Sequence, residues 1–269
     1  MGLGDVGVLR AALGGEGVPA ASVSPLFTAE LGPVMGMRMP GGGKALAAWR
    51  KASAVLGGKG WTPVLLGATP SVAESVKRWS SAPPLASLAL DRADRLDVLS
   101  WLASVRDPAA CEPPARGDWP SESEIAHPVV LSVSDPVTHQ ALSDLVMAFL
   151  PIAEASCAFA WLGFGGWRPC PDPSMHVAVA RHWQRVWGAV PISIAADVVE
   201  YVVPNPPATR EQAVALALEQ YRYCPDIVEH GVGTIESLAA TLMRAQTWYF
   251  WWDRVGDDDE TETDVALSP

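Results

Sequence analysis

The chain has 269 residues and a formal net charge of −11, with 49% hydrophobic and 18% charged residues. This length and apolar fraction are typical of a folded globular protein and argue against a disordered chain. Because nucleic-acid binding requires lysine and arginine to neutralise phosphates, the acidic balance argues against nucleic acid and favours a basic protein as the partner.

The first region, residues 1–106, is predicted to be an N-terminal α/β region. Met1–Glu16 lacks the basic start and the continuous apolar stretch of a signal peptide. Apolar runs without helical period predict strands, and apolar residues at helical spacing predict helices. Strands are therefore expected within Leu26–Met39 and Trp61–Gly67, and helices over Leu46–Leu56, Thr69–Trp79 and Leu85–Val105. The last of these helices is expected to turn four leucines inward, namely Leu88, Leu96, Leu99 and Leu102.

Five prolines and one glycine lie between Asp107 and Pro128, so residues 107–128 are predicted to be a Pro-rich linker or an ordered loop. Residues 129–254 are predicted to form a C-terminal α/β domain. Its first elements are expected to be a strand over Val129–Val133, a helix that Asp135 caps, and a strand over Cys157–Phe164. The inner stripe expected for this helix consists of Leu142, Leu145, Val146 and Phe149.

The long apolar run Leu145–Trp167 is not expected to span a membrane. Pro151 and Glu154 interrupt the run, whereas a spanning helix needs about 20 largely uninterrupted apolar residues. The four cysteines form no C-x-x-C pair and suggest no disulfide framework, which favours free thiols in a reducing compartment. These features together predict a cytoplasmic protein.

The remaining elements are expected to be a helix that Ser174 caps, a strand hairpin, two helices and a final strand. Listed in order, their ranges are 174–187, 190–195 with 198–203, 209–223, 234–243 and 248–252, with capping by Thr209 and Thr234. The predicted fold is α/β, with a mixed sheet flanked by helices and the order β-α-β-β-α-α-β in the C-terminal half. Residues 255–269 carry six acidic residues and no lysine or arginine, which predicts an acidic, disordered, solubilising tail.

Three motifs in the second region occur in a recognisable order. They are the glycine-rich segment Trp161–Trp167, the segment from Pro206 to Asp226 that ends in Cys-Pro-Asp, and the aromatic run Trp248–Asp253. Together they resemble the bacterial domain of unknown function 4253 over about residues 158–253. Members of that family often carry Glu-His where this chain has Glu219-Gln220. The resemblance implies a bacterial source and an α/β fold, and it implies no particular reaction.

The candidate catalytic residues are Cys224, Asp226, His230 and Asp253. Cys224 is either a reactive thiol beside a carboxylate or the end of a helix, with Asp226 capping the turn that follows. The second interpretation is favoured because the negative end of a helix dipole disfavours a thiolate. His230 is either a general base beside flexible glycines or a residue that stabilises a helix C-terminus.

No metal or cofactor is expected. His176 and His182 are six residues apart on one predicted helix, and two ligands on one helix face need a spacing of three or four. The glycine-rich segments at Gly41–Gly43 and Gly163–Gly166 depart from the phosphate-loop and dinucleotide-binding patterns.

The aromatic run Trp248–Trp252 is expected to be a strand with aromatic side chains on both faces. Strand alternation places Trp248, Phe250 and Trp252 on one face, and Tyr249 and Trp251 on the other. One interpretation is core packing. The other is a partner-binding surface that consists of Trp167, Trp248, Trp251 and Trp252.

The favoured hypothesis is a non-enzymatic intracellular protein-binding module with an acidic, Trp-rich surface. One concrete version is an immunity-like role, in which the protein neutralises a basic toxin or effector. The alternative is an enzyme or a small-ligand binder with a site around Asp226, His230 and Asp253.

Overall fold

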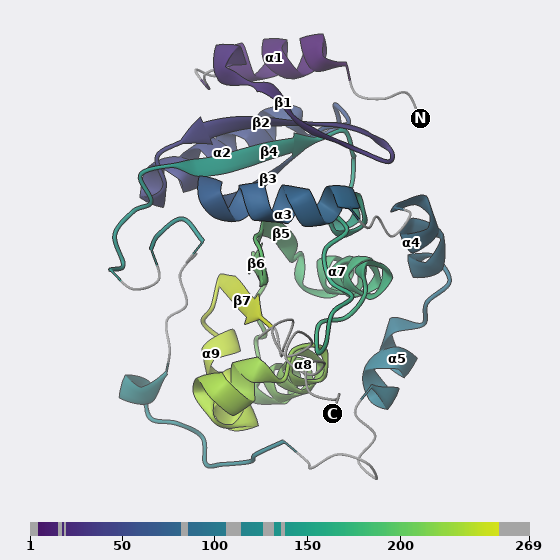
Figure 1. Cartoon of the computed structure of the whole chain (residues 1–269). Helices are drawn as coiled ribbons and strands as arrows, with labels where there is room; N and C mark the ends of the chain where they lie inside the picture. Colours follow the sequence, from purple (N-terminus) through teal and green to yellow (C-terminus); the bar gives the residue numbers. More distant parts are fainter. Residues whose placement is uncertain are drawn as a thin grey trace, which may run out of the picture.

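The computed structural model describes residues 5–15, 18, 20–81, 86–105, 114–125, 132–135 and 138–252. In this part of the chain, seven strands form one mixed sheet in the order β1-β2-β4-β3-β5-β6-β7 (Figure 1). The strands are β1 (Ser24–Ala29), β2 (Gly32–Met39), β3 (Thr62–Ala68), β4 (Leu145–Leu150), β5 (Val190–Ile194), β6 (Val198–Val202) and β7 (Thr247–Trp251). Strands β3 and β5 are parallel, and the other neighbours are antiparallel.

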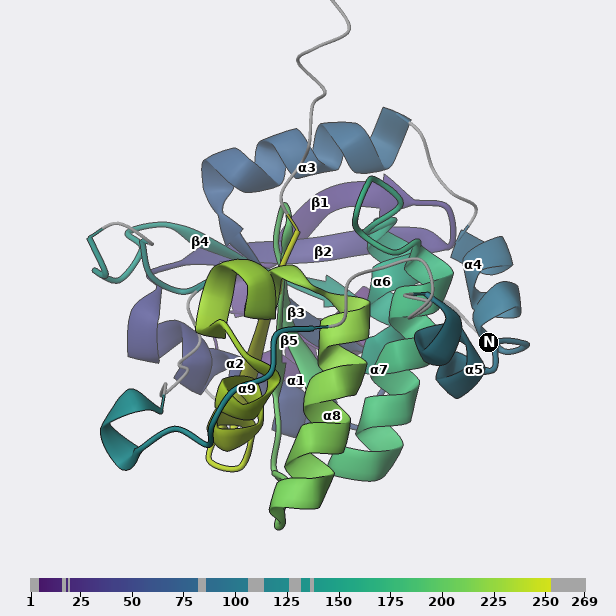
Figure 2. The ribbon, with the colours of Figure 1, turned by 90° about the horizontal axis from the view of Figure 1, so that it is seen from below.

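Helices cover both faces of this sheet, which confirms the predicted α/β fold. They are α1 (Val6–Gly14), α2 (Gly42–Leu56), α3 (Thr69–Ser81), α4 (Ala86–Ala93), α5 (Val98–Ser104), α6 (Ala158–Leu162), α7 (Pro173–Trp187), α8 (Arg210–Tyr223) and α9 (Ile235–Leu242). Helices α1 and α2 pack on one face, and the other helices pack on the opposite face (Figure 2). No helix in the described ranges is long and apolar enough to cross a membrane.

The strands of both predicted regions belong to the same sheet. Strand β4 comes from the second region and lies between β2 and β3 of the first. All six residues of β4 are buried, because Val146, Ala148 and Leu150 face one core and the alternate residues face the other. Residues 107–128 therefore do not separate two sheets.

The helix predicted after Asp135 and Pro136 is wrong, because its inner stripe falls largely within β4. A strand buried on both faces reads as a continuous apolar run, and such a run also matches helical spacing. The strand predicted over Cys157–Phe164 is wrong for a similar reason. That segment forms the end of a 3₁₀ turn and the short helix α6, whose five residues are all buried. Of the strand predicted over 129–133, residues 129–131 lie outside the described ranges, and 132–133 form a turn.

The single helix predicted over Leu85–Val105 is two helices, α4 and α5. The carboxylate of Asp97 caps α5 by accepting a hydrogen bond from the Ser100 amide at 3.2 Å. The break rotates the helical faces relative to each other, so Leu88 and Leu99 are 45% and 54% exposed. The N-cap of helix α7 is Asp172 rather than Ser174, two residues earlier than predicted.

The other predicted elements of the second region are confirmed. Strands β5 and β6 form the expected hairpin, and Thr209 and Thr234 cap α8 and α9 through their side-chain oxygens. The order β-α-β-β-α-α-β is also present, but its first strand is β4 and the short helix α6 follows it. Alternation in β7 buries Trp248 and Phe250 and leaves Tyr249 and Trp251 half-buried.

Residues 114–125, within the predicted linker or loop, are an ordered segment bound to the N-terminal ends of α8 and α9. The Glu236 carboxylate accepts hydrogen bonds from the Arg116 Nε at 2.7 Å and from the Gly117 amide at 2.8 Å. The Ile235 amide donates to the Ala115 carbonyl at 3.0 Å. Arg210 stacks over the Trp119 ring, with 4.3 Å between its guanidinium carbon and the ring centre.

We expect Glu236→Ala to lower the free energy of unfolding by about 1–2 kcal/mol, because it removes charge-assisted hydrogen bonds at a helix N-terminus. Urea denaturation would measure the change, with Glu74→Ala on α3 as the control for an exposed glutamate. Equal losses in the two variants would show that the 114–125 segment contributes nothing to stability through this carboxylate.

Candidate functional site

A cavity of about 280 Å³ lies at the carboxyl ends of the parallel strands β3 and β5. Strand β3 leads directly into α3 here, and β5 turns into β6. In open α/β sheets, ligands commonly bind at the carboxyl ends of parallel strands, where the connections diverge. The lining residues are Gly67, Ala68, Ser71, Ser132, Ser134, Asp135, His139, Leu142, Ala195, Ala196, Asp197, Val198 and Tyr249. We refer to this cavity as the carboxylate pocket.

One wall of the carboxylate pocket comes from residues before β4. The Gly41 amide donates to the Leu142 carbonyl at 2.7 Å, and the Gly42 amide donates to the Val133 carbonyl at 2.8 Å. A Cβ atom at Gly41 would lie only 2.2 Å from the Val133 carbonyl oxygen. The glycines after Pro40 therefore allow this wall to pack directly against the start of α2.

The same wall positions Asp135 and His139. One Asp135 carboxylate oxygen accepts hydrogen bonds from the Thr138 amide at 2.7 Å and from the Thr138 hydroxyl at 3.0 Å. His139 has a φ of 56°, a left-handed conformation that is uncommon for residues other than glycine. Local backbone strain of this kind is often found at binding sites.

The pocket carries negative charge. Asp135 and Asp197 contribute carboxylates, and the lining residues include no lysine or arginine. No hydrogen bond from the described part of the chain reaches the Asp197 carboxylate. The N-terminus of α3 adds a partial positive charge near Ser71, about half an elementary charge, which two carboxylates outweigh.

A third carboxylate lies behind the pocket wall. Glu200 is 1% exposed and accepts hydrogen bonds from the Ser132 amide, at 3.1 Å, and from the Ser132 hydroxyl. In the antiparallel pairing of β6 with β7, Glu200 lies opposite Tyr249. Burial, with Glu200 and Asp197 nearby, raises the pKa of Tyr249 to about 12. Tyr249 therefore stays protonated at neutral pH.

The Tyr249 ring packs beside a second aromatic side chain, Trp251, which lies outside the pocket. The rings of Tyr249 and Trp251 are 5.5 Å apart. Trp251 in turn packs against Gly231, where an added Cβ would lie 3.2 Å from its ring. Gly231 belongs to a π-helical turn, Ile227–Val232, between α8 and α9.

This π-helical turn holds two of the predicted catalytic candidates, Asp226 and His230. Asp226 is buried and lies at the N-terminal end of the turn, whereas His230 lies within the turn and is exposed. The distance between His230 Nδ1 and Asp226 Oδ1 is 3.6 Å. Asp226 does not cap the turn through its side chain, and Gly233 ends the turn. Asp253 lies outside the described residues.

The third candidate, Cys224, ends α8 as the favoured interpretation predicts. Its thiol is buried and donates a hydrogen bond to the Trp251 carbonyl at 2.9 Å. Burial, and then the charge of Asp226, raise the pKa of this thiol well above its usual range. Burial and the raised pKa both favour the neutral thiol, which is the less nucleophilic form.

The predicted surface of four tryptophans does not form. Trp248 and Trp252 are 2% and 0% exposed and belong to the large core, so neither can contact a partner. They face inward because β7 turns this side toward α7 and α8, where Trp183 and Tyr223 pack edge-on against them. Trp167 and Trp251 are half-buried.

A cysteine–histidine pair that the sequence analysis did not identify lies in the core. His176 Nε2 is 3.3 Å from the Cys170 sulfur, and His176 Nδ1 is 2.6 Å from the Tyr223 hydroxyl. Burial lowers the pKa of His176 to about 3, although the charge of Asp172 and the Pro171 carbonyl oppose the shift. A neutral, fully buried imidazole with both nitrogens bonded is a structural group rather than a general base.

Sequence reasoning missed most of the carboxylate pocket. Asp135 is predicted only as a helix cap, and Asp197 lies between the two strands of the predicted hairpin, 190–195 and 198–203. His139 carried no local signal, because its position becomes meaningful only when the 132–142 segment lies beside β3 and β5. Within the described ranges, no group of three or more His, Cys, Asp or Glu side chains is arranged to hold a metal ion.

Comparison with known proteins identifies one region of the chain. No curated protein and no solved structure matches the chain. Residues 146–253 match the family model of DUF4253, a domain of unknown function. This range begins within β4 and covers β5, β6 and β7, so it includes Asp197, Tyr249 and the π-helical turn. The C-terminal region of the chain therefore matches DUF4253, the family that its three motifs resemble.

Proposed function

We propose that the protein is a non-enzymatic binding module whose carboxylate pocket receives a lysine or arginine side chain of a basic partner protein. The observation that carries the proposal is Asp197, which lines a cavity whose described lining residues include no lysine or arginine. A cationic side chain would supply the missing charge and hydrogen bonds. Charge-assisted hydrogen bonds of this kind are stronger than neutral ones.

The aromatic pair beside the pocket supports the same partner chemistry. The Tyr249 ring lines the cavity, and Trp251 extends the aromatic surface toward Asp226 and His230. Cations bind favourably over the faces of tyrosine and tryptophan rings. This arrangement retains Trp251 from the sequence-based hypothesis and replaces the buried Trp248 and Trp252 with Asp197 and Tyr249.

The volume of the pocket fits one side chain better than a large cofactor. At about 280 Å³ it lies below the range of roughly 300–1,000 Å³ that is common for small-molecule sites. The net charge of −11 would also draw a basic partner toward the surface and speed its association. An immunity-like protein that neutralises a basic toxin would need both properties.

The proposed setting is the cytoplasm of a bacterium. The resemblance to a bacterial domain family supports the source. The three described cysteines, Cys157, Cys170 and Cys224, are free thiols, as expected in a reducing compartment.

Fluorescence anisotropy would test the proposal with labelled short peptides that carry a central lysine or arginine between apolar residues. We expect binding to these peptides and at least tenfold weaker binding to the same peptides with central glutamine, because a hydrogen bond to a charged group contributes about 1.5–3 kcal/mol. Asp197→Asn should weaken binding of the lysine or arginine peptide by a similar factor.

Asp118→Asn is the matched control, because it removes one exposed carboxylate from the 114–125 segment. If Asp118→Asn weakens binding as much as Asp197→Asn does, the attraction is general and the pocket is not the site. Equal affinity for lysine and glutamine peptides would also contradict the proposal.

A further inference from the structure

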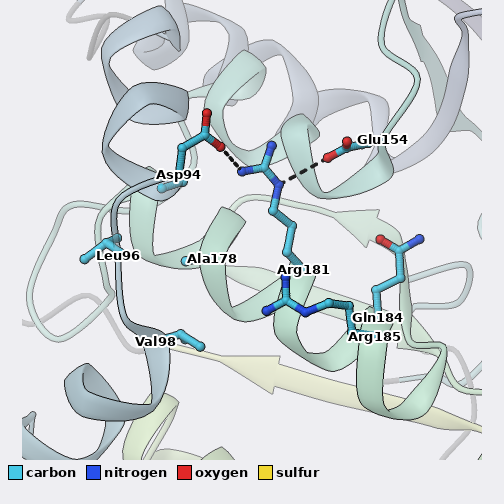
Figure 3. Close-up of a pocket in the computed structure, with 9 residues that line it drawn as sticks. Asp94, Leu96, Val98, Glu154, Ala178, Arg181, Gln184 and Arg185 are labelled. Atoms are coloured by element: carbon cyan, nitrogen blue, oxygen red, sulfur yellow. Dashed lines mark hydrogen bonds and ion pairs between the residues drawn. The ribbon is translucent and has the colours of Figure 1, made fainter.

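A second cavity, of about 480 Å³, lies between α7 and the turn that joins α4 to α5 (Figure 3). Helix α7 contributes Ala178, Arg181, Gln184 and Arg185. The spacing of Ala178, Arg181 and Arg185 places these three on one face of the helix. The opposite wall runs from Ala93 to Val98, and Glu154 also lines the cavity. None of these residues belongs to the carboxylate pocket.

Arg181 is held in place by two carboxylates from different elements. Its Nη1 is 2.5 Å from Asp94 Oδ1, and its Nε is 3.2 Å from Glu154 Oε2. Burial opposes the charged form, but the hydrogen bond to Asp94 and the nearby Glu154 raise the pKa of Arg181 above its usual value. Arg181 is therefore a cation held in place by two ion pairs, and the protein already uses its Nε and Nη1 as donors.

Arg185, one turn further along α7, has no such partner. No hydrogen bond or ion pair within the described ranges involves its guanidinium group. Figure 3 shows its side chain running back along α7 toward the stem of Arg181. The cavity thus presents an unpaired cation from Arg185. It also presents the exposed carboxylates of Asp94 and Glu154, whose side chains are 64% and 58% exposed.

The charges of the cavity select among ligand classes. Arg181 and Arg185 together balance Asp94 and Glu154, so the described lining carries no net charge. A simple anion would be repelled by the two carboxylates, and a simple cation would be repelled by Arg185. A zwitterion satisfies both groups, because its carboxylate can accept from Arg185 and its ammonium group can donate to Asp94.

The rest of the lining indicates what the ligand carries besides its charges. Beside the charged groups the lining has four apolar residues, of which Leu96 is half-buried and Ala93, Val98 and Ala178 are buried. We propose that this cavity binds a free α-amino acid with an apolar side chain. The carboxylate of the amino acid pairs with Arg185, its ammonium group pairs with Asp94, and its side chain packs on Leu96 and Val98.

Isothermal titration calorimetry with L-leucine and L-phenylalanine tests this site in the full chain. We expect saturable binding of one molecule per chain. N-acetylation removes the ammonium charge and amidation removes the carboxylate charge, so each derivative should bind at least tenfold more weakly. Arg185→Gln and Asp94→Asn should each weaken binding of the free amino acid at least tenfold.

Arg50→Gln on α2 is the matched control, because it removes an exposed arginine on the other face of the sheet and should leave the affinity unchanged. Circular dichroism would confirm that each variant is folded, and Asp94→Asn keeps an acceptor for Arg181. Failure of every apolar amino acid to bind would overturn the proposal. Equal affinity for the N-acetyl derivative or for the amide would overturn it too, by showing recognition of one charge alone. This outcome is independent of the peptide experiment, since the two cavities share no residue.

Discussion

Gly165→Ala should destabilise the protein by about 2–5 kcal/mol, as expected when backbone strain and an atomic overlap occur together. Gly165 has a φ of 100°, a conformation that favours glycine. A Cβ atom there would lie 2.1 Å from the Pro171 carbonyl oxygen and 2.6 Å from His176 Nε2. The overlap with Pro171 involves backbone, so no side-chain rotation relieves it.

Gly166→Ala is a close control for this prediction. Gly166 also has a positive φ, of 88°, but an added Cβ would meet no atom within 4 Å. Only the conformational cost should remain, about 1–2 kcal/mol. Guanidinium denaturation of both variants separates the two effects. If the two losses are equal, the close approach of Gly165 to His176 and Pro171 does not contribute to stability.

The glycine-rich segment illustrates what sequence reasoning resolves and where it stops. Arg168 and Pro169, which follow this segment, show from the sequence alone that it departs from the phosphate-loop and dinucleotide-binding patterns. The sequence does not show why glycine is required at position 165, because His176 approaches Gly165 only after α7 folds back against α6. A local pattern shows that glycine is present, but the neighbour that requires it comes from tertiary packing.

Elements with one exposed face were predictable, and two of the elements that are buried throughout, β4 and α6, were not. Helix α8 and strand β7 alternate between buried and half-buried or exposed residues, so their periods appear in the sequence. Strand β4 and helix α6 are buried throughout, and an uninterrupted apolar run has no period to identify. The two elements were therefore exchanged, β4 being read as a helix and α6 as a strand.

The carboxylate pocket was harder to predict than the fold. Its charged residues, Asp135 and Asp197, are 62 positions apart in the sequence and meet through the pairing of β4 with β3 and of β3 with β5. Neither residue has a motif around it. The aromatic run around Tyr249 was noticed, and alternation sorted its two faces correctly. Tyr249, which lines the pocket, lies on the face that also carries Trp251.

His176 should make the stability of the protein strongly dependent on pH between about 6.5 and 3. In the folded state burial lowers its pKa to about 3, whereas in the unfolded state the imidazole has its ordinary pKa of about 6.5. Below pH 6.5 the unfolded chain therefore binds a proton that the folded chain does not. The contribution of His176 to the free energy of unfolding is fully present above pH 6.5. It is lost as the pH falls below 6.5, by up to about 1.4 kcal/mol per pH unit.

Urea denaturation at a series of pH values would measure this slope in the wild type and in His176→Gln. The variant should be less stable at pH 7 by about 1–3 kcal/mol, because the substitution disturbs the hydrogen bonds to Cys170 and Tyr223. Below pH 6.5 the free energy of unfolding of the variant should nevertheless change less with pH than that of the wild type, since glutamine does not titrate. His139→Gln, at an exposed position, should keep the wild-type slope. Parallel curves for the wild type and His176→Gln would mean that His176 accepts a proton as readily in the folded core as in the unfolded chain, which its burial among Phe159, Phe164 and Trp252 argues against.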